Sequence, residues 1–262
     1  MLQYNHLIRR VELNCPRFIP HGQLESVKNV VTHAMMKNGA VRGVFRVLTD
    51  GVQDCRPFSL ESSVQTSFGL FSVYGLNLAK RPEDGLELQR ETRYLAKVLC
   101  SQKRAIRKDH DIRRLGYGLA IAESLSALYS RVYSFYPVPL SPPAIMEALR
   151  SAIPYAVFDH GEPVSALLGS IRRYGELTVI EFTLSATAPS ARGVGMTTAL
   201  ASCIVEEASG AYPSPLIVAE TIAAPVMHSC HDLGMQVHGV LPGHYLMKIG
   251  RREYSNLFMW SL

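Results

Sequence analysis

The sequence predicts a mixed α/β protein, with a central mixed sheet preceded by a smaller N-terminal α/β region. Two observations support this fold class. The chain has 262 residues, which is long for one compact core and sufficient for two small ones. From about residue 112 onward the apolar periodicity gives the order β-α-α-β-β-β-α-β-α-β-β, which indicates a mixed sheet with an antiparallel hairpin core.

The first region, residues 1–108, is expected to contain three strands and two helices. In order, these are a strand at 7–13, a helix at 23–36, strands at 43–48 and 68–78, and a charged helix from 83 onward. The helix at 23–36 is expected to place Val27, Val30, Val31 and Ala34 on one face. The basic stretch at 103–109 is interpreted as a solvated linker, because a nucleic-acid patch would need interleaved aromatic residues and a longer run of charge.

The second region, residues 109–262, shows a more regular alternation. Its expected elements are a strand at 112–120, a helix at 123–134, a short helix opened by Pro142 and Pro143, hairpin strands at 155–158 and 163–168, a strand at 177–188, a helix from Gly195 to about 208, a strand at 216–221, a helix at 224–233, and strands at 235–241 and 256–262. Prolines in a first helical turn are favourable because their missing N–H has no partner there anyway.

Composition excludes several classes of protein. Lys and Arg number 27 against 22 Asp and Glu, a formal charge of +5, so neither an acidic tail protein nor a strongly basic nucleic-acid arm is expected. Glu123 and Glu220 interrupt the most apolar segments, and the N-terminus lacks an apolar run after a basic start, so no membrane span or secretory signal is expected. Five scattered cysteines without a CxxC pair indicate reduced thiols in a cytoplasm, with neither a disulfide framework nor a zinc site.

The most informative segment lies between the strand at 177–188 and the following helix. It reads Pro189-Ser-Ala-Arg192-Gly193-Val194-Gly195-Met196-Thr197-Thr198. Free amides and the positive end of a helix dipole can hold phosphate oxygens at such a place. A Walker A loop is excluded because Met196 stands where Lys is needed, and a dinucleotide fingerprint is excluded because Thr198 replaces its third glycine. An ordinary glycine-rich turn is the structural alternative.

Arg192-x-x-Gly195-x-Thr197 resembles the Arg/Gln-x-x-Gly-x-Gly/Ala loop of the GNAT superfamily of N-acetyltransferases, with Thr197 as a departure. The order of elements in residues 112–262 also resembles the GNAT fold, and Leu233-Gly234-Met235 resembles the family's Leu-Gly-Phe/Tyr helix ending. The resemblance implies acetyl-CoA as the acyl donor. Its pyrophosphate would lie on Arg192, Gly193, Val194, Gly195, Met196 and Thr197, and its pantetheine arm would pair with the backbone of Ser185, Ala186 and Thr187.

Scattered motifs over most of the chain look like a bacterial and archaeal group, the β-lysine N-acetyltransferases. They include the run from Tyr133 to Leu140, Glu181 ahead of Pro189, Gly239-x-Leu241 and the final Met259-Trp260. Two positions depart from that group: Leu184 replaces an Asp, and Met227 falls near an expected Asn.

Acetyl transfer to an amine requires a group that removes the amine's proton. Glu181 is the candidate base because it is the carboxylate on the strand that leads to the loop, in an otherwise apolar or hydroxylated stretch. An apolar setting would raise its pKa toward working pH, so that it acts directly or through a water. The alternative is a glutamate on the solvent face of a half-exposed strand.

Other polar groups leave alternatives open. Cys230 occupies the position of the tyrosine that the family often uses as the thiolate's acid, and it is either a poor acid or a small core residue. His228 and His231 have helical spacing for a metal, but Cys230 does not share their face, and no metal is expected. The pairs Arg172-Arg173 and Arg251-Arg252 either contact an anionic ligand or are solvated hairpin tips. Tyr133, Phe135 and Tyr136 either line an acceptor pocket or pack a hinge.

These observations predict an acetyl-CoA-dependent N-acetyltransferase that acts on the amine of a small amino-acid-like metabolite, with β-lysine as the acceptor that the closer resemblance implies. Residues 1–108 would pack, dimerise or shape the acceptor site, which leaves a homodimer open. The alternatives are a protein amine acetyltransferase and a non-catalytic regulator that binds acyl-CoA. No nucleic-acid or membrane partner is expected, and the expected location is the cytoplasm.

Overall fold

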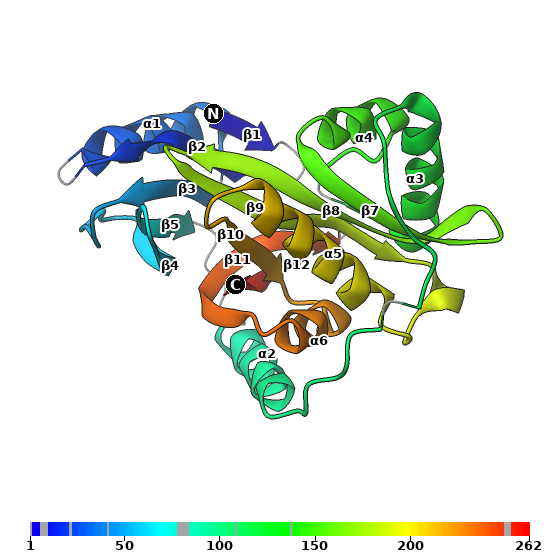
Figure 1. Cartoon of the computed structure of the whole chain (residues 1–262). Helices are drawn as coiled ribbons and strands as arrows, with labels where there is room; N and C mark the ends of the chain where they lie inside the picture. The colour runs from blue at the N-terminus through cyan, green and yellow to red at the C-terminus, as the bar shows by residue number, and fades with distance from the viewer. Residues whose placement is uncertain are drawn as a thin grey trace.

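The structure is a computed structural model (Figure 1) that describes residues 2–5, 10–20, 23–40, 42–77, 84–107, 109–136, 138–248 and 253–262. Its strands are β1 (Leu2–Asn5), β2 (Arg10–Ile19), β3 (Arg42–Thr49), β4 (Ser59–Thr66), β5 (Gly69–Asn77), β6 (Ile112–Arg114), β7 (Ala152–Asp159), β8 (Glu162–Tyr174), β9 (Leu177–Thr187), β10 (Leu216–Thr221), β11 (Gln236–Lys248) and β12 (Glu253–Ser261). Its helices are α1 (Leu24–Asn38), α2 (Asp84–Leu99), α3 (Leu119–Val132), α4 (Pro142–Leu149), α5 (Met196–Ala211) and α6 (Ala224–Asp232).

The described strands form one sheet in the order β1-β2-β3-β5-β4-β11-β12-β10-β9-β8-β7-β6. The pairs β2–β3 and β9–β10 are parallel and the other pairs are antiparallel, so the predicted mixed α/β class is confirmed. The two halves of the chain join where Gly239 of β11 pairs with Ser62 of β4. The division at residue 108 therefore crosses a continuous sheet, and it stays a prediction as a domain boundary.

Strand β3 of the N-terminal half is buried on both faces. Every described residue of β3 is buried, because alternate side chains enter different cores. Phe45 and Val47 pack against the apolar face of α1. Val44 and Leu48 point the other way, into a core shared with Leu177 and Val179 of β9 and with Met259 of β12.

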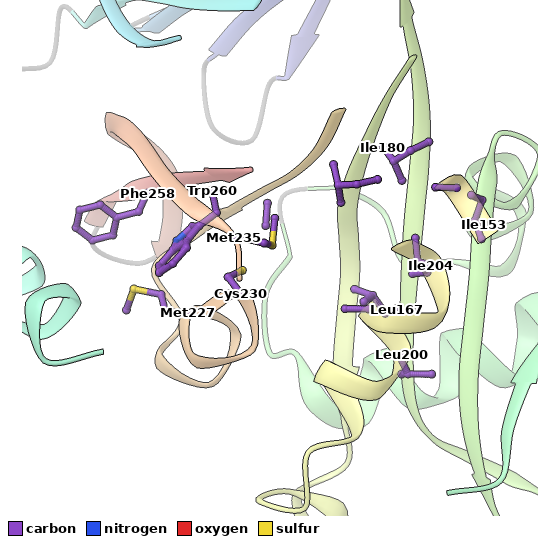
Figure 2. Packing of buried hydrophobic residues seen from close by; sticks show 14 of the residues in the cluster. Ile153, Leu167, Ile180, Leu200, Ile204, Met227, Cys230, Met235, Phe258 and Trp260 are labelled. Atoms are coloured by element: carbon purple, nitrogen blue, oxygen red, sulfur yellow. The ribbon is translucent and has the colours of Figure 1, made fainter. Parts of the chain in front are cut away.

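Helices cover both faces of the sheet in the second half (Figure 1). On one face α3 and α4 pack over β7, β8 and the end of β9. On the other face lie α5 and α6, and Figure 2 shows Leu200 and Ile204 of α5 together with Leu167 of β8. Leu95 and Val98 of α2 belong to this second core, so α2 packs with the C-terminal half although it precedes the predicted linker. Among the described helices none is long and apolar enough to cross a membrane.

Most predicted elements are present. The departures include β1 and β4, which were not predicted, and the bounds of β6 and β8. The strand expected at 112–120 covers only Ile112–Arg114, and α3 already begins at Leu119, because the glycines at 116 and 118 interrupt the extended run. β4 was not predicted because its sequence is largely polar, although Ser62 and Val64 are buried. β8 continues to Tyr174, so Arg172 lies within a strand and is not at a hairpin tip.

Candidate active site

The loop between β9 and α5 has the geometry of an anion site. After a short 3₁₀ turn at Pro189–Ala191, Gly193 and Gly195 have positive φ angles of 86° and 85°, a conformation that glycine adopts without steric cost. Gly195 is the residue immediately before α5, whose first-turn amides have no acceptor within the helix. A Cβ atom at either glycine would meet no heavy atom within 4 Å, so the loop surface is open to a ligand.

β9 separates from β10 just before this loop. Pairing between the two strands ends where Ala219 lies opposite Phe182, while β9 stays paired with β8 as far as Thr187. The amide of Ala188 donates to the carbonyl of Val164 on β8 at 2.8 Å. Backbone groups alternate in direction along an antiparallel strand, so the amide of Thr187 points to the open side. This is the splayed edge that the pantetheine prediction requires.

Three polar side chains bind the backbone along this edge. The hydroxyl of Tyr133 donates to the carbonyl of Ser185, and Arg192 Nε donates to the carbonyl of Thr187 at 3.2 Å. Leu184 has a positive φ of 49° at an irregularity in the β8–β9 pairing, and its amide donates to the hydroxyl of Tyr136 at 3.3 Å. The edge therefore carries amide and carbonyl groups that are directed away from β8.

Two cavities meet at the splayed strands and share Val132, Ser185, Thr197, Ala223, Val226 and Ser229. The cavity at the loop, about 480 Å³, is called here the cofactor cavity. It is lined by seven of the nine residues predicted to hold the cofactor: Ser185, Thr187, Arg192, Gly193, Gly195, Met196 and Thr197. The side chain of Ala186 is instead buried against α3 and α4, and Val194 lines a smaller neighbouring hollow.

The lining residues of the cofactor cavity that sequence reasoning missed include Tyr94 of α2 and Arg104 of the predicted linker. Arg104 is anchored to Asp232 by its amide, at 3.0 Å, and by Nε, at 2.9 Å. The segment interpreted as a plain connector thus brings a cation to the wall beside the glycine loop, where an anion would lie.

The other cavity, about 590 Å³, is called here the acceptor cavity. Its aromatic lining comes from Tyr133, Phe135 and Tyr136 after α3 and from Phe182 of β9. These residues therefore line a cavity, as one of the two sequence interpretations required. Burial raises the pKa of Tyr136 to about 12, so its hydroxyl stays protonated at neutral pH.

Glu181 lies behind this cavity and is absent from its lining residues. Its side chain is 15% exposed and pairs with Arg172, Nε to Oε2, at 2.9 Å. Burial raises the pKa of Glu181, and the Arg172 guanidinium opposes that rise. The solvent-facing alternative is therefore wrong, and so is the expected apolar setting, because charged groups surround the carboxylate.

A buried ionic network extends from Glu181 into the N-terminal half. Arg46 of β3 binds Glu12 of β2 and Glu220 of β10, the latter at 2.6 Å. The Glu181 carboxylate interacts electrostatically with both Arg46 and Glu220. Glu220 also lines the acceptor cavity, so a side chain from the N-terminal half fixes a carboxylate in the wall of that cavity.

Cys230 of α6 also lines the acceptor cavity, and burial raises the pKa of its thiol to about 12. Figure 2 shows it beside Met227 and Trp260 in the core. His228 faces Tyr94, with Nε2 and the hydroxyl 3.4 Å apart. Within the described part of the chain no three His, Cys, Asp or Glu side chains gather as a metal site would need. Arg251 and Arg252 lie outside the described residues.

No family model matches this sequence, and no curated protein matches it. The chain is similar to solved structures over little more than half its length. For the ribosomal-protein-S18-alanine N-acetyltransferase from Escherichia coli the TM-score is 0.47 and the identity 12%, over 58% of this chain and 91% of that one. For a GNAT superfamily phosphinothricin acetyltransferase from Sinorhizobium meliloti in complex with AcCoA the values are 0.47 and 18%, over 58% and 87%.

Proposed function

We propose that this chain is an acetyl-CoA-dependent N-acetyltransferase that acts on the amine of a small metabolite. The observation that carries the proposal is the meeting of two cavities at a splayed strand edge, with a glycine loop and a helix N-terminus at the far end of one of them. Amides at a helix N-terminus suit phosphate oxygens. The amide of Thr187, which points away from β8, suits a carbonyl of the pantetheine arm, because exposed strand groups need partners.

The proposed reaction is direct transfer. The neutral amine attacks the thioester carbonyl, the carbon–sulfur bond breaks, and the CoA thiolate leaves and takes a proton from water. The amine's proton passes to Glu181, whose raised pKa suits a base. Glu181 does not line the cavity, so in this scheme a water carries the proton to it.

The acceptor cavity has aromatic walls and a volume of about 590 Å³, which is in the range of small-molecule sites and supports a small-molecule acceptor. β-Lysine stays in the proposal as the acceptor that the sequence motifs favour. The five cysteines are free thiols, in keeping with the proposed cytoplasmic location. Residues 1–108 would shape the acceptor site, and a homodimer remains part of the proposal.

A turnover assay tests the proposal directly. The purified chain is incubated with acetyl-CoA and a panel of amines, and free thiol and acetylated amine are measured together. Equal yields of both products are expected for at least one amine. Tight CoA binding by calorimetry without transfer to any amine would support the non-catalytic regulator instead.

A further inference from the structure

The charged side chains that line the acceptor cavity are both carboxylates. They are Glu220 of β10 and Glu91 of α2, and the described lining residues include no Arg, Lys or His. The two come from elements far apart in the sequence, one on each side of the predicted linker. A cavity whose charged groups are all anionic selects for cationic ligands and against anionic ones.

Each carboxylate is held in place by a side chain from a strand other than its own element. Arg46 Nη2 contacts Glu220 Oε1 at 2.6 Å, and the side chain of Glu220 is 10% exposed. Asn256 of β12, which is itself buried, donates through Nδ2 to Glu91 Oε2 at 2.6 Å. Fixed carboxylates bind a cation at a lower entropic cost than mobile surface carboxylates do. This favours Glu220 and Glu91 as binding groups for a cationic ligand.

The two carboxylates occupy different parts of the fold. Glu220 stands on the strand that flanks the splay, shortly before Ala223, which both cavities share. Glu91 stands on α2, which packs against α6. A ligand with a cationic group at each end would therefore contact β10 with one group and α2 with the other.

The walls between the carboxylates suit a hydrocarbon spacer. Phe135, Tyr136 and Phe182 contribute aromatic surface, and Leu184, Val226 and Leu257 contribute aliphatic surface. Methylene groups bury well against such walls, and aromatic faces also attract ammonium groups.

From this arrangement we infer that the acceptor is an aliphatic dication, a diamine or longer polyamine without a carboxylate, bound with one ammonium at Glu220 and the other at Glu91. The inference rests on the proposed function and names its substrate class. It differs from the β-lysine expectation, because the carboxylate of an amino acid would add an anion to a cavity lined by two.

The test compares three acceptors of similar length with the purified chain: 1,4-diaminobutane, n-butylamine and β-lysine. Transfer is measured as CoA thiol release. We expect kcat/KM for the diamine to exceed that for butylamine by about 10- to 100-fold, the usual worth of one more charged hydrogen-bonded contact. Equal or better use of butylamine or β-lysine would overturn the inference and leave the proposed transferase activity standing.

Glu91→Gln sharpens the test because glutamine keeps the shape and still accepts from Asn256. It should raise KM for the diamine by about 10- to 100-fold with little change in kcat, and so remove most of the preference for the diamine over butylamine. Glu123→Gln, on the exposed face of α3, is the matched control and should change neither. An unchanged diamine preference in Glu91→Gln would overturn the role of Glu91.

Calorimetry separates failure of this inference from failure of the proposed function. Diamine binding to the CoA-loaded chain is measured without turnover, for the unaltered protein and for Glu91→Gln. Binding that depends on Glu91 supports the cavity assignment even if no transfer occurs, in which case only the proposed activity fails. No binding and no transfer of the diamine, with transfer to another amine, overturns the inference alone.

Discussion

The cofactor cavity and the acceptor cavity share a wall but are built in different ways. Half of the residues that line the cofactor cavity come from one stretch of chain, 185–198, which includes the two glycines of the loop. The acceptor lining is gathered from α2, the segment after α3, β9, β10, α6 and β12. A short motif can encode the first kind of site, whereas only the assembled tertiary fold creates the second.

The energetics of the two sites differ in the same way. At the loop, glycine conformations and a helix terminus provide the recognition groups. At the acceptor cavity, Glu220 is tolerated in a buried wall because Arg46 from the N-terminal sheet pairs with it. The acceptor side should therefore depend on the N-terminal half, and the cofactor side should depend on it much less.

The largest predicted effect is the loss of stability in Arg46→Met. The substitution removes the cation shared by Glu12 and Glu220, and loss of one partner from a buried ion pair costs about 3–5 kcal/mol. Urea denaturation should show a drop of that size in the free energy of unfolding, with partial recovery in the double variant Arg46→Met, Glu220→Gln. Arg113→Met, which breaks an exposed pair with Asp111, should cost less than about 1 kcal/mol. Equal losses in the two single variants would contradict the importance of the network.

Glu181→Gln tests whether the proton acceptor is Glu181 on β9 or a carboxylate that lines the acceptor cavity. We expect kcat/KM to fall by about 100-fold or more, the usual worth of a positioned base, with CoA affinity unchanged. Because the pKa of Glu181 is raised, the wild-type rate should fall as pH drops through a value above the ordinary Glu pKa. The rate of the Glu181→Gln variant should not show this fall at low pH. Part of its activity should return at high pH, where the amine deprotonates without help.

Exposed Glu176, changed to Gln in the same hairpin, is the control for Glu181→Gln. Wild-type rates in the Glu181 variant across pH of about 6 to 9 would make the Glu181–Arg172 pair purely structural. If the rate of Glu220→Gln alone then no longer increased with pH, the proton acceptor would be Glu220, which lines the acceptor cavity.

The fold was predictable where local periodicity is strong. The strand Leu216–Thr221 and the helix that starts at Ala224 were found at those bounds because apolar runs and a first-turn proline mark them. β4 was missed because its buried face includes serines, which become buried only through pairing with β5 and β11. Burial of that kind depends on long-range contacts that a single sequence does not display.

The site was predictable in the same uneven way. Gly193 and Gly195 lie in one contiguous motif, so the loop could be read directly. Arg46 and Glu220 are separated by most of the chain, and nothing in the sequence pairs them. A signal did exist, since each is a charged residue inside an otherwise apolar strand. The same reasoning that selected Glu181 would have selected Arg46 and Glu220 as candidates. It would not have predicted that the two side chains are in contact.

Gly195→Asp tests the cofactor side of the comparison. The new side chain would enter open space and bring a carboxylate to the proposed pyrophosphate site. Two like charges about 5 Å apart at an effective dielectric near 20 repel by about 3 kcal/mol, so CoA affinity should fall by about 100-fold in calorimetry. Gly195→Asn carries the same backbone strain without the charge and should lose much less. Equal losses in the two variants would attribute the effect to strain at positive φ, and unchanged affinity in both would show that the loop is not the site.

The smallest expected effect concerns the strand edge that the two cavities share. Thr187→Pro deletes an amide that points to the open side of β9, and because the bond to β8 at this level comes from Ala188, it should leave that ladder intact. Thr187→Val keeps the amide but removes the hydroxyl that lies near Ser165 and Thr197. One hydrogen bond to the pantetheine arm is worth about 1 kcal/mol, so CoA should bind Thr187→Pro about 5- to 10-fold more weakly than Thr187→Val. Circular dichroism must show both variants folded for the comparison to hold. Equal CoA affinity in two folded variants would mean that the splayed edge does not hold the cofactor arm, even if Gly195→Asp places the phosphates at the loop.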